Sequence, residues 1–304
     1  MTRRNPAASV RQRLLNRSKK DGTDYNQLLI RYGIERLLYR LSRSPYRDRF
    51  VLKGAMLFAV WRGSLHRPTQ DLDLLGFGDP STTAISQVFR DLCALPVEED
   101  GLVFDPESVS AGEIRAADEY GGIRVHLTGS LGGAVVRLQV DVGFGDVVIP
   151  APVDAEYPVL LGPPSPVLRI YPREAVVAEK LEVIVKLGML NSRFKDYYDL
   201  SYLSRNFEFD GTELIKAIGA TFRRRGTALP IAPPVGLTPT FAEDAAKQQQ
   251  WTAFCRRLTG VVAPVLAEIV AEVADFVLLP LTAAADGTPF PQIWEPRQHW
   301  MQKA

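Results

Sequence analysis

The chain has 304 residues, which is enough for two domains or for one large core with an appended helical region. Its apolar fraction of 46% and charged fraction of 23% are ordinary for a globular protein, and they exclude a disordered or fibrous chain. The formal net charge of +1 excludes a uniformly basic protein that coats nucleic acid, although it allows a local basic surface. The cysteines, Cys93 and Cys255, form neither a metal-type spacing nor a disulfide framework, so we expect a protein of the reducing cytoplasm.

The hydrophobic segments do not indicate a membrane protein. No apolar signal core follows the polar N-terminal residues. The most apolar run, residues 261–279, is interrupted by Glu268, Glu272 and Asp275. We therefore predict an amphipathic or buried helix there, and no membrane partner.

Helical and extended patterns alternate in the first half of the chain. A basic segment of about twenty residues comes first and fits either an extended arm or a short helix. Asp24 can cap the next helix, and a short apolar segment, residues 50–52, leads into Lys53-Gly54. We predict helices over residues 25–41, 55–61 and 81–95, and strands over residues 69–75, 123–128 and 134–142, of which the last two form a β-hairpin.

Proline becomes frequent after residue 146, where we place the junction between two domains. The second half is mainly helical, with helices predicted over residues 173–187, 195–203, 241–257 and 261–277. The fold class is therefore α+β. We expect a mixed sheet with flanking helices over residues 1–160, followed by a mainly helical domain over residues 161–304.

Two carboxylates in the predicted strand 69–75 are the strongest chemical signal. Asp71 and Asp73 are two residues apart, so they point to one face while Leu72 points to the other. Carboxylates held this close repel each other unless a cation lies between them, and Mg²⁺, or Mn²⁺ in its place, prefers such oxygen ligands. Asp141 on the adjoining predicted strand is our candidate for a third metal ligand, with Asp146 as the alternative.

An isolated Asp-x-Asp at a strand end is more often a solvated turn or a salt-bridged edge. Here, however, Lys53-Gly54 precedes a predicted helix, where backbone N–H groups favour phosphate. Arg62 and Arg67 lie between this turn and the carboxylates and could neutralise a triphosphate. The combination favours a phosphate-binding site over a structural role.

The segments Leu52-Lys53-Gly54-Ala55 and Arg67-Pro68-Thr69-Gln70-Asp71-Leu72-Asp73-Leu74 resemble the nucleotidyltransferase superfamily. More narrowly, they are similar to the AbiEii/AbiGii-type toxins, which include the MenT toxins of mycobacteria. Later segments, Glu179-Lys180-Leu181 and residues 193–200, match further elements of that family in the expected order. This chain departs from the superfamily at the phosphate turn, where Ala55 replaces the usual serine.

The resemblance implies a nucleotidyltransferase fold and an enzyme that transfers a nucleoside monophosphate from an NTP to RNA. In MenT-like toxins the acceptor is the 3′ end of tRNA, and the modification blocks aminoacylation and translation. The usual partner is a separately encoded antitoxin. The site residues implied are Asp71, Asp73 and Asp141 for the metal; Lys53, Gly54, Arg62, Arg67, Thr69 and Lys180 for the nucleotide; and Lys180, Asp196 and Asp199 in catalysis.

Several alternatives stay open at the level of the sequence. Lys180 could be an exposed lysine that pairs with Glu179 or Glu182, and Asp196 and Asp199 could form structural pairs. A small-molecule nucleotidyltransferase, such as an antibiotic-modifying enzyme, would share the carboxylates, and so would a catalytically silent interaction protein. Arg223-Arg224-Arg225 together with Arg193, Lys195, Arg256 and Arg257 could form a basic rim for RNA, although such runs are more often solvated surface.

Overall fold

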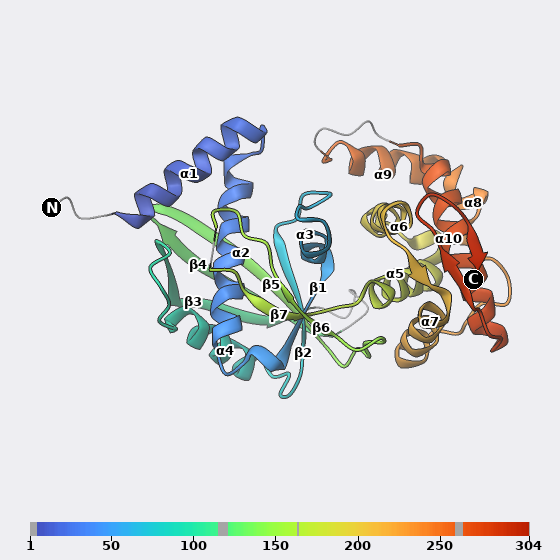
Figure 1. Ribbon diagram of the computed structural model, residues 1–304, viewed down its shortest axis with the longest axis horizontal. Helices are drawn as coiled ribbons and strands as arrows, with labels where there is room; N and C mark the ends of the chain where they lie inside the picture. The colour runs from blue at the N-terminus through green and yellow to red at the C-terminus, as the bar shows by residue number, and fades with distance from the viewer. Residues whose placement is uncertain (1–4, 115–120, 163, 259–263, 304) are drawn as a thin grey trace. The chain divides into compact units, whose positions relative to one another are not determined.

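The structure is a computed structural model that describes residues 5–114, 121–162, 164–258 and 264–303. The chain divides into two compact units (Figure 1). The first unit comprises residues 1–145 and 153–170, and the second comprises residues 146–152 and 171–304. The boundary that the sequence predicts, between residues 160 and 161, falls between the paired strands β6 (Val153–Glu156) and β7 (Val167–Ile170), which both belong to the first unit.

A seven-stranded mixed sheet forms the first unit, with strand order β3-β4-β5-β2-β1-β7-β6. The β2–β5 and β1–β7 pairs are parallel, and the other neighbours are antiparallel. The predicted mixed sheet is thus confirmed, and its remaining strands are β1 (Phe50–Lys53), β2 (Asp71–Gly76), β3 (Leu102–Glu113), β4 (Gly122–Leu131) and β5 (Ala134–Phe144).

The predicted hairpin is β4–β5, and its turn follows from the sequence. Gly132 and Gly133 are the two residues between the strands, with φ of 53° and 86°. Both angles lie in the left-handed region that a two-residue hairpin turn of the commonest type requires, and glycine adopts it without steric cost.

The helices of the first unit begin at recognisable caps. Asp24 accepts a hydrogen bond from the Gln27 amide, and Ser81 accepts one from the Ala84 amide. The predicted helix 55–61 begins instead as a 3₁₀ turn, because Gly54 (φ 73°) leaves the strand in a left-handed conformation. The helical segments are α1 (Pro6–Asp21), α2 (Tyr25–Arg43), η1 (Arg47–Arg49), η2 (Gly54–Met56), α3 (Leu57–Arg62) and α4 (Thr82–Ala94).

One face of the sheet is apolar and lies under α2 and α4. On β4 and β5 every second residue is buried, among them Val125, Val136 and Leu138. A Cβ on Gly33 of α2 would lie 2.7 Å from Val136 and 3.0 Å from Leu138, so the helix packs closely on β5 at a glycine. Because the core packs on one face of the sheet, the polar side chains of the strands lie on the opposite face.

A buried carboxylate on α2 fixes the loop before β7. Glu35 accepts hydrogen bonds from the Leu160 amide at 2.9 Å and from the Arg31 side chain at 3.2 Å. Burial raises the pKa of Glu35 to about 7, although both partners act in the opposite direction. This carboxylate belongs to the core of the first unit and not to the polar face of the sheet.

Helices dominate the second unit, as the sequence predicts. The helix predicted over residues 173–187 has the bounds of α5, and a small three-stranded sheet of order β10-β9-β8 accompanies the helices. The helical segments are α5 (Arg173–Leu187), η3 (Gly188–Leu190), α6 (Phe194–Asn206), α7 (Gly211–Arg225), η4 (Val235–Leu237), α8 (Pro239–Ala242), α9 (Ala245–Cys255) and α10 (Leu266–Asp286), and the strands are β8 (Phe209–Asp210), β9 (Gln292–Trp294) and β10 (Trp300–Gln302).

Two predicted helices of this unit are wrong in their bounds. The helix predicted over residues 241–257 is divided into α8 and α9, because Asp244 caps a new helix by accepting from the Lys247 amide. The helix predicted over residues 261–277 begins at Leu266 and continues through Pro280 to Asp286. Residues 261–263 lie outside the described residues. Aromatic contacts of Phe276 with Trp294 and Trp300 extend the core of this unit beyond the predicted end.

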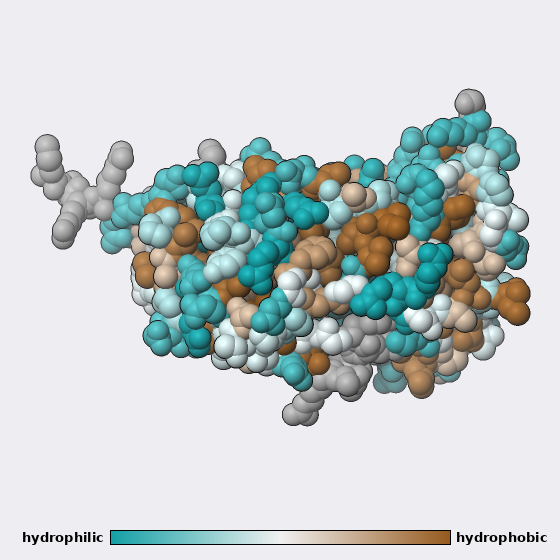
Figure 2. Space-filling model, turned by 90° about the horizontal axis from the view of Figure 1, so that it is seen from below, coloured by the Kyte–Doolittle hydropathy of each residue, from teal (hydrophilic) through white to brown (hydrophobic). Residues whose placement is uncertain are grey.

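Hydrophilic and hydrophobic residues alternate over the face of the molecule drawn in Figure 2. Among the described residues, no helix has both the length and the apolar character that a bilayer span needs. Cys93 and Cys255 are both buried as free thiols, in agreement with the absence of a predicted disulfide.

Candidate active site

Asp71 and Asp73 occupy the first and third positions of β2, on the polar face of the sheet. Asp71 is exposed and Asp73 is half-buried, whereas Leu72 and Leu74 are buried on the opposite face. The strand begins directly after the loop that contains Pro68, and the side chain of its first residue, Asp71, is open to solvent. The predicted orientation of the two carboxylates is therefore confirmed.

The strand register brings further charged residues beside this pair. Asp73 lies opposite Asp141 on the parallel strand β5 and opposite Lys53 on the antiparallel strand β1. Asp141 in turn lies opposite Arg124 on β4. Directly paired residues share one face of a sheet, so four strands present the row Lys53, Asp73, Asp141 and Arg124, with cations at its two ends.

Two glycines lie close to the charged groups in this row. A Cβ on Gly54 would overlap the Asp73 carboxylate, so the backbone at the turn after β1 lies directly against that group. A Cβ on Gly143 of β5 would lie 4.0 Å from the Nζ atom of Lys53. The Lys53 ammonium thus reaches across β2 toward β5, on the face that carries Asp73 and Asp141.

A two-pronged ion pair fixes the carboxylate of Asp141. Arg124 donates from Nε to Oδ1 at 2.8 Å and from Nη2 to Oδ2 at 2.7 Å. The Nε2 atom of Gln139 lies at 3.3 and 3.4 Å from the same two oxygens. Both oxygens of Asp141 therefore have a cationic partner, and this geometry is the most directional that a carboxylate can adopt with arginine.

The carboxylates fit a divalent cation only in part. Asp71 and Asp73 present their oxygens on one face, and Mg²⁺ is commonly held by one or two carboxylates together with substrate phosphates and water. Within the described residues, however, no three side chains of His, Cys, Asp or Glu are grouped to hold a metal ion. The predicted third ligand, Asp141, is instead bound to Arg124.

Three further residues predicted to bind the nucleotide lie on the segment between Gly54 and β2. Arg62 ends α3 and is exposed, and Arg67 and Thr69 are half-buried in the loop that follows. The helix that begins after Gly54 is a 3₁₀ turn followed by the six residues of α3. The expected dipole of a long helix is therefore absent at Gly54, and phosphate binding would depend on side chains and local N–H groups.

A second charged cluster lies within the second unit. Lys180 of α5 contacts Asp196 at 2.7 Å and Asp199 at 2.8 Å, and both aspartates lie on one face of α6. Arg193 reaches Asp196 from the start of that helix, at 2.7 Å. Both aspartates are fully buried and the Lys180 side chain is 13% exposed, so Lys180 is not the exposed lysine of the alternative interpretation.

Opposing effects act on the pKa of Asp196. Burial by itself raises the pKa, but the positive charges of Lys180 and Arg193 outweigh burial and hold the pKa below its ordinary value. Asp196 is therefore a carboxylate with two cationic partners, and it is suited to fixing the position of Lys180.

A third cluster lies around Arg225. This residue, at the end of α7, is one of the candidates for a basic rim, but its side chain is only 6% exposed. It contacts Glu182 at 3.0 Å, Glu179 at 3.3 Å and both oxygens of Asp146 at 3.3 Å. Asp146, the alternative third metal ligand, is thus held by Arg225 within the second unit.

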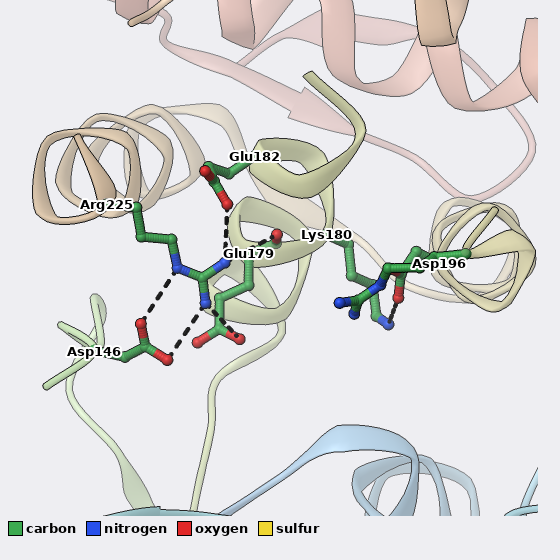
Figure 3. Close-up of polar contacts among 7 residues, drawn as sticks. Asp146, Glu179, Lys180, Glu182, Asp196 and Arg225 are labelled. Carbon is green, nitrogen blue, oxygen red and sulfur yellow. Dashed lines mark hydrogen bonds and ion pairs between the residues drawn. The ribbon is translucent and has the colours of Figure 1, made fainter. Parts of the chain in front are cut away.

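Figure 3 shows that these two clusters lie on different sides of α5, with Arg225 and its carboxylates on one side and Lys180 with Asp196 on the other. Thr227 also donates a hydrogen bond to Glu182. Burial would lower the pKa of Arg225, but the surrounding carboxylates raise it above its ordinary value. Of the predicted arginine run, Arg223 and Arg224 remain on the surface.

Arg124 is the member of the site that the sequence interpretation did not select. Its signal was present, because counting outward from the Gly132-Gly133 turn places Arg124 opposite Asp141. The predicted strands 123–128 and 134–142 contain both residues, and the register of the hairpin between them is the signal that pairs Arg124 with Asp141.

Comparisons with known proteins identify the family of the chain. The family model described as nucleotidyl transferase AbiEii toxin, type IV TA system, matches residues 36–277. No sequence among curated proteins matches the chain significantly.

Two crystal structures from Helicobacter pylori are similar in fold, each at 15% sequence identity. One is described as a candidate nucleotidyltransferase, with a TM-score of 0.44 over 83% of this chain and 92% of that chain. The other, JHP933, has a TM-score of 0.46 over 83% of this chain and 90% of that chain. The family assignment comes from the sequence match, which includes both the carboxylates of β2 and the Lys180 cluster. The chain therefore belongs to the AbiEii family of nucleotidyltransferase toxins.

Proposed function

We propose that this toxin transfers a nucleoside monophosphate from an NTP to the 3′ end of tRNA, and that it uses Mg²⁺ or Mn²⁺. The observation that carries the proposal is the in-register row of Lys53, Asp73 and Asp141 beside the exposed carboxylate of Asp71. Nucleotide transfer requires carboxylates that can hold a metal ion and a cationic side chain close by. The charge on the triphosphate must be neutralised as the bond between the α- and β-phosphates breaks.

The reaction assigns a role to each side chain. The hydroxyl oxygen of the acceptor attacks the α-phosphorus, the bond to the β-phosphate oxygen breaks, and pyrophosphate leaves with the electron pair. Asp71 and Asp73 would hold the divalent cation, which neutralises the triphosphate when it is bound. Asp141 would take the proton of the attacking hydroxyl or hold a second cation, and Lys53, Arg62 and Arg67 would bind phosphate oxygens.

Lys180 has a proposed role as a compact cation for the β- and γ-phosphates. Asp196 and Asp199 would then fix the direction of its ammonium group, an arrangement supported by their contacts at 2.7 and 2.8 Å. A lysine with buried carboxylate partners keeps its charge and loses little conformational entropy when a phosphate binds.

The acceptor and partners follow from the family. tRNA is proposed because transfer to the tRNA acceptor end stops aminoacylation and therefore translation, which accounts for toxicity. Arg223 and Arg224 remain on the surface to contact an RNA backbone, whereas Arg225 does not. A cytoplasmic location and a separately encoded antitoxin partner complete the proposal.

The test is transfer of label to RNA. Purified protein is incubated with total tRNA, Mg²⁺ and each of the four labelled NTPs in turn. We expect at least one NTP to label tRNA at its 3′ end, and the Asp71→Asn and Asp73→Asn variants to lose about 10²-fold or more of that rate. Asp154→Asn, which changes an exposed carboxylate on β6 of the same unit, is the matched control and should keep full activity.

Two outcomes would contradict the proposal. Absence of label from RNA with every NTP would exclude the tRNA acceptor, and label in small molecules alone would favour an antibiotic-modifying type of transferase. Equal transfer by wild type, Asp71→Asn and Asp73→Asn would exclude these carboxylates from the reaction.

A further inference from the structure

The Arg124–Asp141 ion pair carries an inference about how the metal site is assembled, and this inference rests on the proposed function. Asp141 and Asp73 are neighbours across a parallel strand pair, so their like charges repel unless a cation compensates for them. In this structure the cation beside Asp141 is the Arg124 guanidinium, which contacts both carboxylate oxygens.

We propose that Arg124 is a positioning residue that acts as the resting counter-ion of Asp141 and competes with the divalent metal for this carboxylate. While Arg124 contacts both oxygens of Asp141, it neutralises this carboxylate and occupies part of its acceptor capacity, so a metal is held mainly by Asp71 and Asp73.

The exposure of the two partners supports an exchangeable pair. The Asp141 side chain is 20% exposed and that of Arg124 is 41% exposed, so the guanidinium can leave without exposing the core. The amide of Gln139 lies beside the same carboxylate and stays available to orient it. Arg124 therefore opposes the binding of a metal by Asp141, and its release would favour that binding.

Arg137 provides a matched comparison on the same face. It is exposed on β5 and lies four residues from Asp141, with its side chain on the same side of the strand. Four residues of strand span about 13 Å, which exceeds the Debye length of about 10 Å at 0.1 M salt. Removal of Arg137 thus changes the total charge as removal of Arg124 does, without removing a partner of Asp141.

The experiment measures Mn²⁺ binding to the full chain by electron paramagnetic resonance, without nucleotide or RNA. We expect Arg124→Ala to tighten Mn²⁺ binding by about fivefold to tenfold, and Arg137→Ala to change it by less than about twofold. In the Asp141→Asn background, Arg124→Ala should change Mn²⁺ binding no more than Arg137→Ala does, because the carboxylate for which Arg124 and the metal compete has been removed. Arg124→Gln, which keeps the three carbon atoms nearest the backbone but removes the charge, should tighten binding like Arg124→Ala and replaces it if the alanine variant does not fold.

The outcomes separate this inference from the proposed function. Equal or weaker Mn²⁺ binding in the Arg124 variants, with binding still dependent on Asp71, would overturn the role of Arg124 and leave the proposed metal site intact. If Asp71→Asn does not weaken Mn²⁺ binding, the proposed metal site itself is wrong. An effect of Arg124→Ala that persists in the Asp141→Asn background would also overturn the inference, because it would not act through Asp141.

Discussion

The carboxylates of the first unit and those of the second unit have different surroundings. Asp71 and Asp73 lie on the polar face of a sheet, where Asp71 is exposed and Asp73 is half-buried. Asp196 and Asp199 are fully buried on α6, and they share Lys180. The sheet carboxylates lie where a cation can reach them from solution, whereas the helical carboxylates are enclosed together with a cation that belongs to the protein.

This difference separates two uses of the same chemical group. An exposed carboxylate costs little to leave charged, so it can remain available for a substrate or a metal. A buried carboxylate must have a fixed partner, and loss of that partner leaves an uncompensated charge in the interior. We therefore expect substitutions of Asp71 and Asp73 to change activity at constant stability, and substitutions in the Lys180 and Arg225 clusters to change stability.

The largest effect is expected for Lys180→Met, which leaves two buried aspartates with Arg193 as the remaining cation of this cluster. The free energy of unfolding should fall by about 3–5 kcal/mol. Tryptophan fluorescence during urea unfolding measures this loss, because Trp251, Trp294 and Trp300 all belong to the second unit and a Trp61→Phe background removes the remaining tryptophan signal.

Lys186→Met is the matched control for this variant. Lys186 is exposed near the end of the same helix, and its loss should change stability by less than about 0.5 kcal/mol. The comparison between the two units fails if Lys180→Met is as stable as Lys186→Met, because the buried aspartates would then need no cation.

A smaller loss, about 2–3 kcal/mol, is expected for Arg225→Met. Glu182 is fully buried and loses its cationic partner but keeps its bond from Thr227, whereas Asp146 and Glu179 are partly exposed and can be solvated. Urea unfolding of this variant is compared with Arg223→Met, a surface substitution two residues away on the same helix. Weaker RNA binding at unchanged stability would show instead that Arg225 is a contact residue.

The smallest effect on stability is expected for Asp71→Asn, within about 0.5 kcal/mol of wild type, because the side chain is exposed. Unfolding followed through Trp61, with the three tryptophans of the second unit replaced by phenylalanine, measures the first unit separately. A destabilisation above about 1 kcal/mol would show that Asp71 has a structural partner whose loss the sheet cannot tolerate.

Much of the fold could be predicted where the local pattern is regular. The apolar spacing in residues 173–187 gave the helix α5, and alternation in residues 134–142 gave most of β5. Strand β3 was not predicted, because Pro106 and a register shift between Asp105 and Ser110 interrupt its alternation. β6 and β7 are four residues long and lie in the proline-rich segment, so they lack a clear period.

The site could be predicted only as far as local geometry determines it. The period of a strand places Asp71 and Asp73 on one face, and the bounds of α6 place Asp196 and Asp199 on one face. The burial of Arg225 could not be predicted, because its partners Asp146 and Glu179 are far from it in sequence. A run of three arginines looks the same whether its last member faces water or enters the core.

The late position of β7 in the chain has a consequence for synthesis. β7 pairs with β1 through Leu52 and Ile170, although more than a hundred residues separate them. While the ribosome is still making residues 54–166, the outer edge of β1 has no strand beside it, and its backbone groups must be solvated or covered by other chains. The strand that leads into the Lys53-Gly54 turn is therefore completed only after the whole β2–β5 region has emerged, so an intact site is a late product of translation.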